Sequence, residues 1–148
     1  MNIFVAADHN GFHLKQQIID YLKKQNYLVE DVGDKKYDAL DDFPIFATAA
    51  IVKMQASNEK DSRAILICGS GQGMLIAANR FKGIRAGLGY SVQAAKSIRN
   101  DEDSNVLALP AEILTEDSKW QLIVDTWLKT PFAAAPRFIR RNNELDQI

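Results

Sequence analysis

Residues 67–75 read ICGSGQGML, which places the only cysteine of the chain directly before three glycines at alternate positions. Flexible glycine backbone lets several N–H groups face one anion where a helix begins. The same N–H groups lower the pKa of a neighbouring thiol and so make it reactive. A lone cysteine at the end of an apolar strand is also often an inert core residue. The pattern alone therefore leaves Cys68 balanced between a reactive thiol over an anion site and a buried residue before a tight turn.

The spacing of the glycines excludes several known loop chemistries. The dinucleotide fingerprint G-x-G-x-x-G fails because position 74 holds Met74, and the loop follows the third predicted strand rather than the first. A P-loop would need Gly-Lys-Ser/Thr, and a cysteine phosphatase loop would need an arginine at position 74. A nucleotide-binding oxidoreductase is therefore disfavoured, and a general anion-binding loop remains.

A second polar turn, DHNG at residues 8–11, also follows a strongly apolar run. In open α/β sheets, ligands collect beyond the carboxyl ends of the strands. If both runs are parallel strands, both turns project from the same edge of the sheet. The sequence therefore predicts a site at that edge that combines Asp8, His9, Cys68 and Ser70 with the glycine loop.

Alternating strands and helices are expected to position these loops. Short apolar runs predict strands, and apolar residues at helical spacing predict helices between them. The predicted strands cover residues 2–7, 27–32, 63–68, 84–90 and 105–110, and the helices cover 12–25, 43–54, 91–100, 120–128 and 137–148, with a further helix that begins inside the glycine loop and runs to residue 81. Asp42 is placed to cap the second helix. This alternation indicates a Rossmann-like three-layer α/β/α sandwich with a five-stranded parallel sheet.

Composition narrows the class of protein further. The 148 residues carry a net charge of -1, which argues against nucleic acid as a partner, and no apolar run approaches the length that spans a membrane. One cysteine supplies neither an internal disulfide nor a zinc ligand set. The first residues lack the pattern of a secretory leader. We therefore expect a cytoplasmic protein in which residues 1–148 form one domain, ending in a basic tail over residues 131–148.

Five motifs together resemble one family over nearly the whole chain. They are ADHNGF, DFP, ILICGSGQGMLIAANRFKGIRA, SNVLAL and RFIRR, and they resemble the ribose-5-phosphate isomerase type B and galactose-6-phosphate isomerase family. The resemblance implies a Rossmann-like fold, a homodimer or dimer of dimers with active sites between subunits, and a tail that packs on a partner subunit. It also implies isomerisation of a sugar phosphate between aldose and ketose through a cis-enediolate, with no metal and no cofactor.

The resemblance also implies a role for individual residues. Cys68 would be the base that moves a proton between C1 and C2, and Ser70 would donate a hydrogen bond beside it. Asp8 would hold substrate hydroxyls. The backbone N–H groups of the loop would stabilise the enediolate oxygen, and the phosphate would be held by basic side chains; these two sets are Gly69, Gly71 and Gly73, and His9, Arg137 and Arg141.

Several ligand-facing positions depart from the family pattern. Asp101 stands where a histidine opens the furanose ring, and Glu102 stands where an asparagine contacts the substrate. Phe43 replaces a tyrosine, Glu112 an arginine that helps to hold phosphate, and Phe138 a histidine.

The base and its glycine loop are intact, with Ser70 keeping the hydroxyl of the family's threonine. We therefore predict the same proton transfer on an altered substrate, with poor activity on ribose 5-phosphate. A tetrose 4-phosphate, which need not ring-open, would tolerate the lost histidine, as would proton transfer by Asp101. The alternative is a non-catalytic sugar-phosphate-binding subunit, or an inactive relative.

Overall fold

A parallel five-stranded sheet forms the middle layer of the computed structural model, which describes residues 1–114 and 120–148. The strands lie in the order β2-β1-β3-β5-β4, and all four pairings are parallel. Their bounds are β1 Asn2–Ala7, β2 Leu28–Asp31, β3 Arg63–Cys68, β4 Ala86–Leu88 and β5 Val106–Pro110. The register pairs Ala7 with Ile67 and Cys68 with Pro110, so β1, β3 and β5 end at the same edge.

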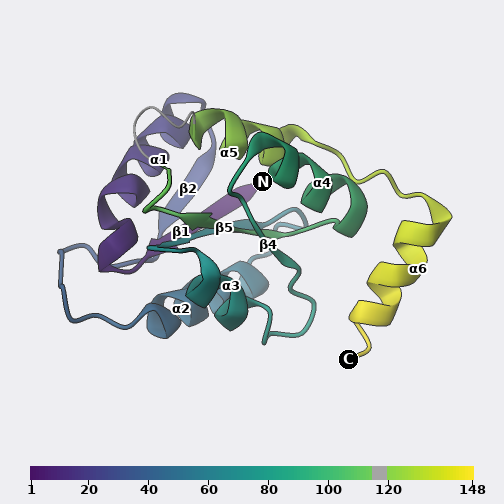
Figure 1. Cartoon of the computed structure of the whole chain (residues 1–148), viewed down its shortest axis with the longest axis horizontal. Helices are drawn as coiled ribbons and strands as arrows, with labels where there is room; N and C mark the ends of the chain where they lie inside the picture. The colour runs from purple at the N-terminus through teal and green to yellow at the C-terminus, as the bar shows by residue number, and fades with distance from the viewer. Residues whose placement is uncertain (115–119) are drawn as a thin grey trace.

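Helices cover both faces of the sheet, as Figure 1 shows. Helices α1, α4 and α5 pack on one face, and α2 and α3 pack on the other. Their bounds are α1 Phe12–Lys24, α2 Phe43–Ala56, α3 Gln72–Ala78, α4 Val92–Glu102 and α5 Trp120–Lys129, with a short 3-10 turn at His9–Gly11 and a last helix, α6, at Pro136–Leu145. The predicted three-layer parallel fold is therefore confirmed.

The central strands are apolar on both sides because they are covered on both sides. Alternate residues of β1 point to opposite faces, so Ile3 and Val5 enter one core while Phe4 and Ala6 enter the other. Every residue of β3 and β5 is buried. The near-continuous hydrophobic runs of the sequence thus specify buried parallel strands.

Two local predictions need correction. Helix α3 ends at Ala78 rather than at residue 81, because the side-chain amide of Asn79 donates to the carbonyl of Ala86 and accepts from its N–H. That pairing ties the end of the helix to the start of β4. Asp42 precedes α2 in an extended conformation, but its side chain makes no capping hydrogen bond.

Helix α6 lies at the end of the molecule, beyond α4 (Figure 1). Phe138 and Asn142 are buried, whereas most of the helix is exposed. Near the carboxyl end of α6, Asp146 accepts two hydrogen bonds from Arg85, at 3.0 and 3.1 Å. Across the two described stretches of chain, no helix has the length and hydropathy needed to cross a membrane.

Candidate active site

Three strand ends meet beneath the predicted site. The N–H of Asp8, directly after β1, donates to the carbonyl of Ile67 in β3 at 3.2 Å. The N–H of Ala111, directly after β5, donates to the carbonyl of Cys68 at 2.9 Å. These bonds continue the sheet pairing by one residue on each side and fix Asp8 and Cys68 at one edge. The predicted convergence of the two polar turns is therefore observed.

The glycine loop leaves this edge and turns directly into α3. Gly71 has φ of +75°, and an added Cβ would lie 2.5 Å from Cδ1 of Leu88 and 3.2 Å from the backbone of Leu109. Only glycine meets both demands without strain. The hydroxyl of Ser70 accepts a hydrogen bond from the N–H of Gln72 at 3.3 Å. Cys68 is 4% exposed and packs in the core beneath α2 and α3, directly before the loop.

Two side chains border the loop on either side. The ring of Phe43, in the first turn of α2, packs against Gly73. A Cβ built on that glycine would lie 3.0 Å from the ring carbon Cζ. The carboxylate of Glu112 lies over Gly69, and the N–H of Glu112 donates to the Gly69 carbonyl at 3.0 Å. The structure therefore places four of the predicted residues in direct contact around the thiol-bearing loop.

Asp8 is a buried carboxyl at this edge, 5% exposed. Its Oδ1 accepts a hydrogen bond from the N–H of Gly11 at 3.1 Å. Burial raises the pKa of Asp8 above its usual 3.8, against the opposing effects of the Gly11 bond and of neighbouring His9. Asp8 is thus a desolvated carboxyl whose neutral form is favoured by its surroundings.

His9 has a partner that the sequence analysis missed. Its Nδ1 lies 2.7 Å from Oδ1 of Asp41, and its backbone N–H donates to the same oxygen at 3.0 Å. The hydrogen bond to Asp41 raises the pKa of His9 above 6.5. Asn10, also missed, places its side-chain nitrogen 3.0 Å from Nε2 of His9. The acid-rich run DALDD was the available signal, but spacing alone does not show which carboxylate faces the histidine.

Asp101 and Glu102 lie elsewhere in the chain. They occupy the last turn of α4, which runs antiparallel to the strands for 11 residues, about 16 Å. The carbonyl of Glu102 accepts from Nε of Arg85 at 2.7 Å, just before β4 begins, so this turn sits at the amino edge of the sheet. Within one chain, neither residue meets Cys68.

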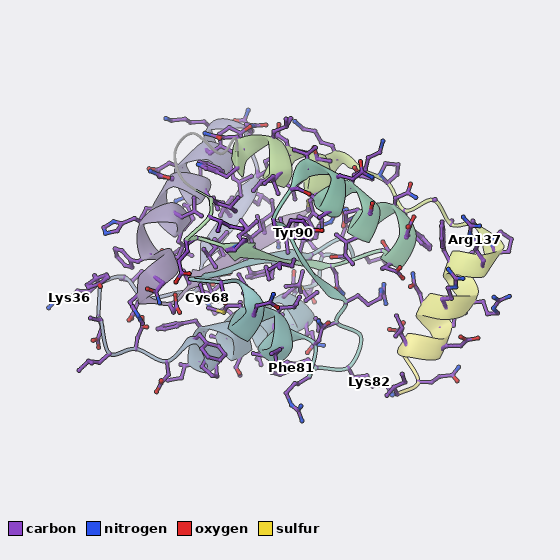
Figure 2. All side chains as sticks on the ribbon, viewed as in Figure 1. Lys36, Cys68, Phe81, Lys82, Tyr90 and Arg137 are labelled. Atoms are coloured by element: carbon purple, nitrogen blue, oxygen red, sulfur yellow. The ribbon has the colours of Figure 1, made fainter. Side chains whose placement is uncertain are left out.

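Arg137 and Arg141 are likewise separated from the loop. Both are exposed on α6, and Figure 2 shows Arg137 at the end of the molecule remote from Cys68. The guanidinium of Arg137 packs 4.7 Å from the ring centre of Phe138. The predicted site residues therefore fall into two groups that lie apart in the molecule, one around Cys68 and the other on α6 and the end of α4.

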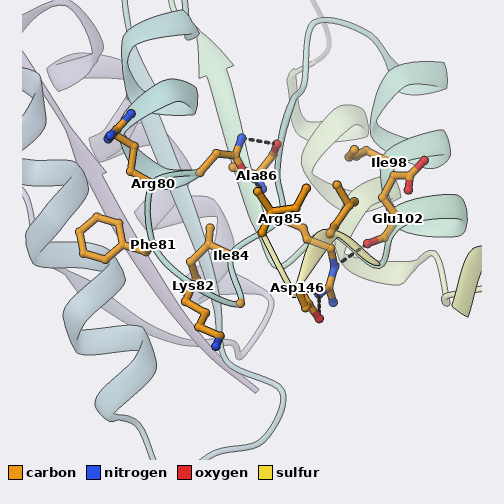
Figure 3. Close-up of a pocket in the computed structure, with 13 residues that line it drawn as sticks. Arg80, Phe81, Lys82, Ile84, Arg85, Ala86, Ile98, Glu102 and Asp146 are labelled. Carbon is orange, nitrogen blue, oxygen red and sulfur yellow. Dashed lines mark hydrogen bonds and ion pairs between the residues drawn. The ribbon is translucent and has the colours of Figure 1, made fainter. Parts of the chain in front are cut away.

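A cavity of about 510 Å³ lies near the second group (Figure 3). The connection between α3 and β4 forms one wall, with Arg80, Lys82 and Arg85, and the end of α6 forms the other. None of the residues around Cys68 lines it. Among the residues described, no cluster of three His, Cys, Asp or Glu side chains could hold a metal ion.

Comparison with known proteins decides the family. A family profile described as Ribose/Galactose Isomerase matches residues 3–146. The chain belongs to the ribose/galactose isomerase family. The predicted family, and with it the class of aldose–ketose isomerases, is therefore confirmed.

Individual relatives of this isomerase family are similar over almost the full length of the chain. A probable ribose-5-phosphate isomerase B of Mycoplasma genitalium is 40% identical over 147 residues, covering 99% of this chain and 93% of that protein. The ribose-5-phosphate isomerase B of Mycobacterium tuberculosis is 37% identical over 141 residues, covering 95% and 85%.

Solved structures of this family share the fold. The crystal structure of the Mycoplasma genitalium enzyme with bound ribulose-5-phosphate superposes with a TM-score of 0.92 at 39% identity, covering 99% of this chain and 94% of that one. The ribose 5-phosphate isomerase of Thermotoga maritima gives a TM-score of 0.90 at 37% identity, with coverage of 99% and 98%.

Proposed function

We propose that this isomerase acts on a sugar phosphate through a cis-enediolate, with Cys68 as the base. The observation that carries the proposal is the position of Cys68. Cys68 is the last residue of β3, directly before the glycine loop, at the same sheet edge as the buried carboxyl of Asp8. A base, a polar group for hydroxyls and a row of backbone N–H groups are the parts that enediolate chemistry requires.

The proposed proton transfer balances within the substrate. The Cys68 thiolate removes the proton from C2 of the aldose, and the electron pair forms the enediolate while the carbonyl oxygen at C1 gains negative charge. The thiol then returns the proton to C1, and the oxygen at C2 becomes the ketone as its hydroxyl proton moves to O1. The N–H groups of Gly69, Gly71 and Gly73 stabilise the negative oxygen, and Ser70 donates beside them. This scheme needs no metal and no cofactor.

The charge around the loop supports a site completed by a second copy. Asp8, Asp41 and Glu112 bring three carboxyl groups, and His9 is the basic side chain described beside them. A phosphate dianion requires further cations. We propose that Arg137 and Arg141 of a partner's α6 supply them, and that the tail of residues 131–148 packs on the partner subunit.

The same arrangement would bring the partner's α4 end to the site. There Asp101 and Glu102 would face the substrate in place of ring-opening and binding residues of the family. Helix α2 is apolar on its exposed side as well, with Ile45 64% and Val52 52% exposed, which favours a buried face in an assembly. We therefore propose a homodimer or a dimer of dimers.

The residues around the loop favour an altered substrate. Glu112 brings negative charge where the family holds phosphate with an arginine, and Phe43 offers no hydroxyl. Relatives of this chain are named ribose-5-phosphate isomerase B, but we propose that this protein turns over ribose 5-phosphate poorly. We propose that it prefers a tetrose 4-phosphate or another sugar phosphate that need not ring-open. A cytoplasmic location remains a prediction from composition.

Exchange of substrate protons with solvent deuterium tests the function directly. The purified protein is incubated in D₂O with tetrose to hexose phosphates and their unphosphorylated sugars, and loss of the C1 or C2 proton is followed by NMR. Exchange with at least one phosphate is expected, and Cys68→Ala should lower its rate by roughly 10²- to 10⁴-fold.

The matched variant Cys68→Ser keeps the size of the side chain and should be nearly as slow, because a hydroxyl is a far weaker acid than a thiol. Binding of a sugar phosphate without exchange by the wild-type protein would favour the non-catalytic binding subunit instead. Full exchange by Cys68→Ala would show that another group is the base.

A further inference from the structure

We propose that Asp41 is a positioning residue, which holds the imidazole of His9 with Nδ1 turned inward and Nε2 turned toward the substrate anion. The inference rests on the proposed function, since it names how a ligand of that same site is oriented. It concerns Asp41 in the loop of residues 33–42, a residue to which the sequence analysis assigned no role.

One oxygen of Asp41 fixes His9 at two points. Oδ1 accepts from the backbone N–H of His9 at 3.0 Å and lies 2.7 Å from Nδ1. The Asp41 side chain is only 7% exposed, whereas that of His9 is 27% exposed. A buried carboxylate that bonds both the main chain and the ring leaves the ring little freedom about its χ angles. The exposed part of His9 is therefore the edge that carries Nε2.

Nε2 of His9 has a contact that can be exchanged. The side-chain nitrogen of Asn10 lies 3.0 Å away, and Asn10 is exposed. A neutral ring with its proton on Nδ1 accepts this bond at Nε2. When Nε2 is protonated it donates instead. The Asn10 amide must then rotate to present its oxygen, or an anion must replace it as the partner of Nε2. The ring is thus anchored on one side and open to a ligand on the other.

The loop that carries Asp41 is itself anchored. Lys15 is fully buried and donates to both carboxylate oxygens of Asp31 and to the carbonyl of Asp34. Near the other end, the carboxylate of Asp38 accepts from the N–H of Leu40 at 2.9 Å. The bonds from Lys15 hold the start of the loop to α1, and the Asp38 bond stabilises a turn within the loop just before Asp41.

Three carboxylates among the described residues act on His9. Asp8 precedes it, and Asp38 and Asp41 face it from the loop, whereas Glu112 lies with Asn10 at Gly69. These carboxylates favour the imidazolium, in keeping with the raised pKa of His9. Below that pKa, Nε2–H is a charged donor for a phosphate oxygen. As pH rises through it, the donor and its affinity for the anion are lost.

NMR titration of the free protein tests the positioning without any substrate. The chain has two histidines, so the exposed His13 is an internal reference. In the wild type, the neutral His9 ring should carry its proton on Nδ1. Asp41→Asn keeps an oxygen that accepts from the ring but removes the charge, so the pKa of His9 should fall while His13 is unchanged. Asp41→Ala should also release the Nδ1–H tautomer.

The control is Asp42→Asn, which removes the same charge one residue later from a side chain with no capping hydrogen bond. It should leave the titration of His9 almost unchanged. An unshifted His9 in Asp41→Asn, or an equal shift in Asp42→Asn, would overturn the proposal. So would a wild-type ring with its proton on Nε2 alone.

A second readout uses the substrate found by the deuterium exchange panel. Asp41→Asn should raise KM at neutral pH by about 10-fold, the value of one charge-assisted hydrogen bond, and leave kcat nearly constant. The rise should shrink at low pH, where His9 is protonated in both proteins. An equal loss at every pH would indicate a merely structural role. If no sugar phosphate exchanges its C1 or C2 proton with deuterium, the proposed function is wrong. The NMR titration still tests the positioning role of Asp41 in that case.

Discussion

The carboxylate of Glu112 lies over Gly69: a Cβ built on that glycine would be 2.5 Å from Oε1. The same pair is joined by a backbone hydrogen bond of 3.0 Å, so the position of Glu112 relative to the loop is set by the main chain. A negative group therefore borders the loop beside the proposed base, at the position where the family resemblance leads us to expect an arginine.

Reversing this charge should strengthen binding of phosphorylated sugars. Glu112→Arg removes a carboxylate and adds a bidentate donor, which we expect to lower KM for ribose 5-phosphate by about 10-fold or more. Steady-state kinetics at two salt concentrations measures the change. Glu59→Arg makes the same change of charge at an exposed residue that pairs with the amino terminus, and should leave KM unaltered. Equal effects of the two variants would point to net charge rather than to the loop.

Two glycines with the same backbone conformation should differ in their tolerance of a side chain. Gly71 and Gly83 have φ of +75° and +74°, but only Gly71 is crowded, by Leu88 and the backbone of Leu109. Gly83→Ala should cost about 1–2 kcal/mol from backbone strain alone. Gly71→Ala adds a steric clash and should cost about 2–5 kcal/mol. Urea unfolding gives both values, and equal losses would contradict the crowding.

Two lysines bind the same carboxylate from different environments. Lys15 is fully buried and Lys35 has a side chain that is 68% exposed, yet both contact Asp31. Lys15→Met should lower the free energy of unfolding by about 3–5 kcal/mol, because a carboxylate is left without its buried partner. Lys35→Met should cost less than about 1 kcal/mol. Thermal unfolding at constant pH compares the two losses of stability. Similar losses would show that water replaces Lys15 as the hydrogen-bond partner of Asp31.

The raised pKa of Asp8 makes a stability prediction with a definite sign. Between its unfolded pKa of 3.8 and its higher folded pKa, the native protein binds more protons, so stability falls as pH rises through this window. Asp8→Asn keeps an oxygen that accepts from Gly11 and removes the charge. The variant should therefore be more stable than wild type at pH 7, with the gain disappearing below pH 3.8.

Urea unfolding at acidic and neutral pH checks this difference, and Asp20→Asn on the exposed side of α1 serves as control. The same Asp8→Asn protein should lose affinity for substrate hydroxyls, since a carboxylate accepts stronger hydrogen bonds than an amide. A variant that is less stable at neutral pH would contradict the desolvation of Asp8.

The sequence predicted the layers and the site edge because both depend on local patterns. Apolar runs such as residues 63–68 specify a buried strand, and parallel strands necessarily bring the turns after Ala7 and Cys68 together. The early end of α3 was not predictable, because it depends on Asn79 bonding the backbone of a strand seven residues later.

Partners across the fold were equally hidden from the sequence. The contact between His9 and Asp41 spans 32 residues. The acid-rich loop offers other carboxylates at almost the same distance from His9 along the chain. The expected distribution of Asp101 and Arg137 between subunits likewise depends on assembly rather than on local pattern. Propensity and periodicity carry no information about such pairings.

The loop of residues 33–42 is held at its two ends, by Lys15 at Asp31 and Asp34 and by His9 at Asp41, while residues 35–40 between them are exposed. The anchored ends therefore belong to the scaffold of the fold, whereas residues 35–40 are exposed and free to differ in length. Exchange of the middle segment for segments of other lengths should alter the border of the proposed site without disturbing the core, to which residues 35–40 do not belong. We therefore expect changes in the length of this segment to change the size of the sugar that the enzyme accepts.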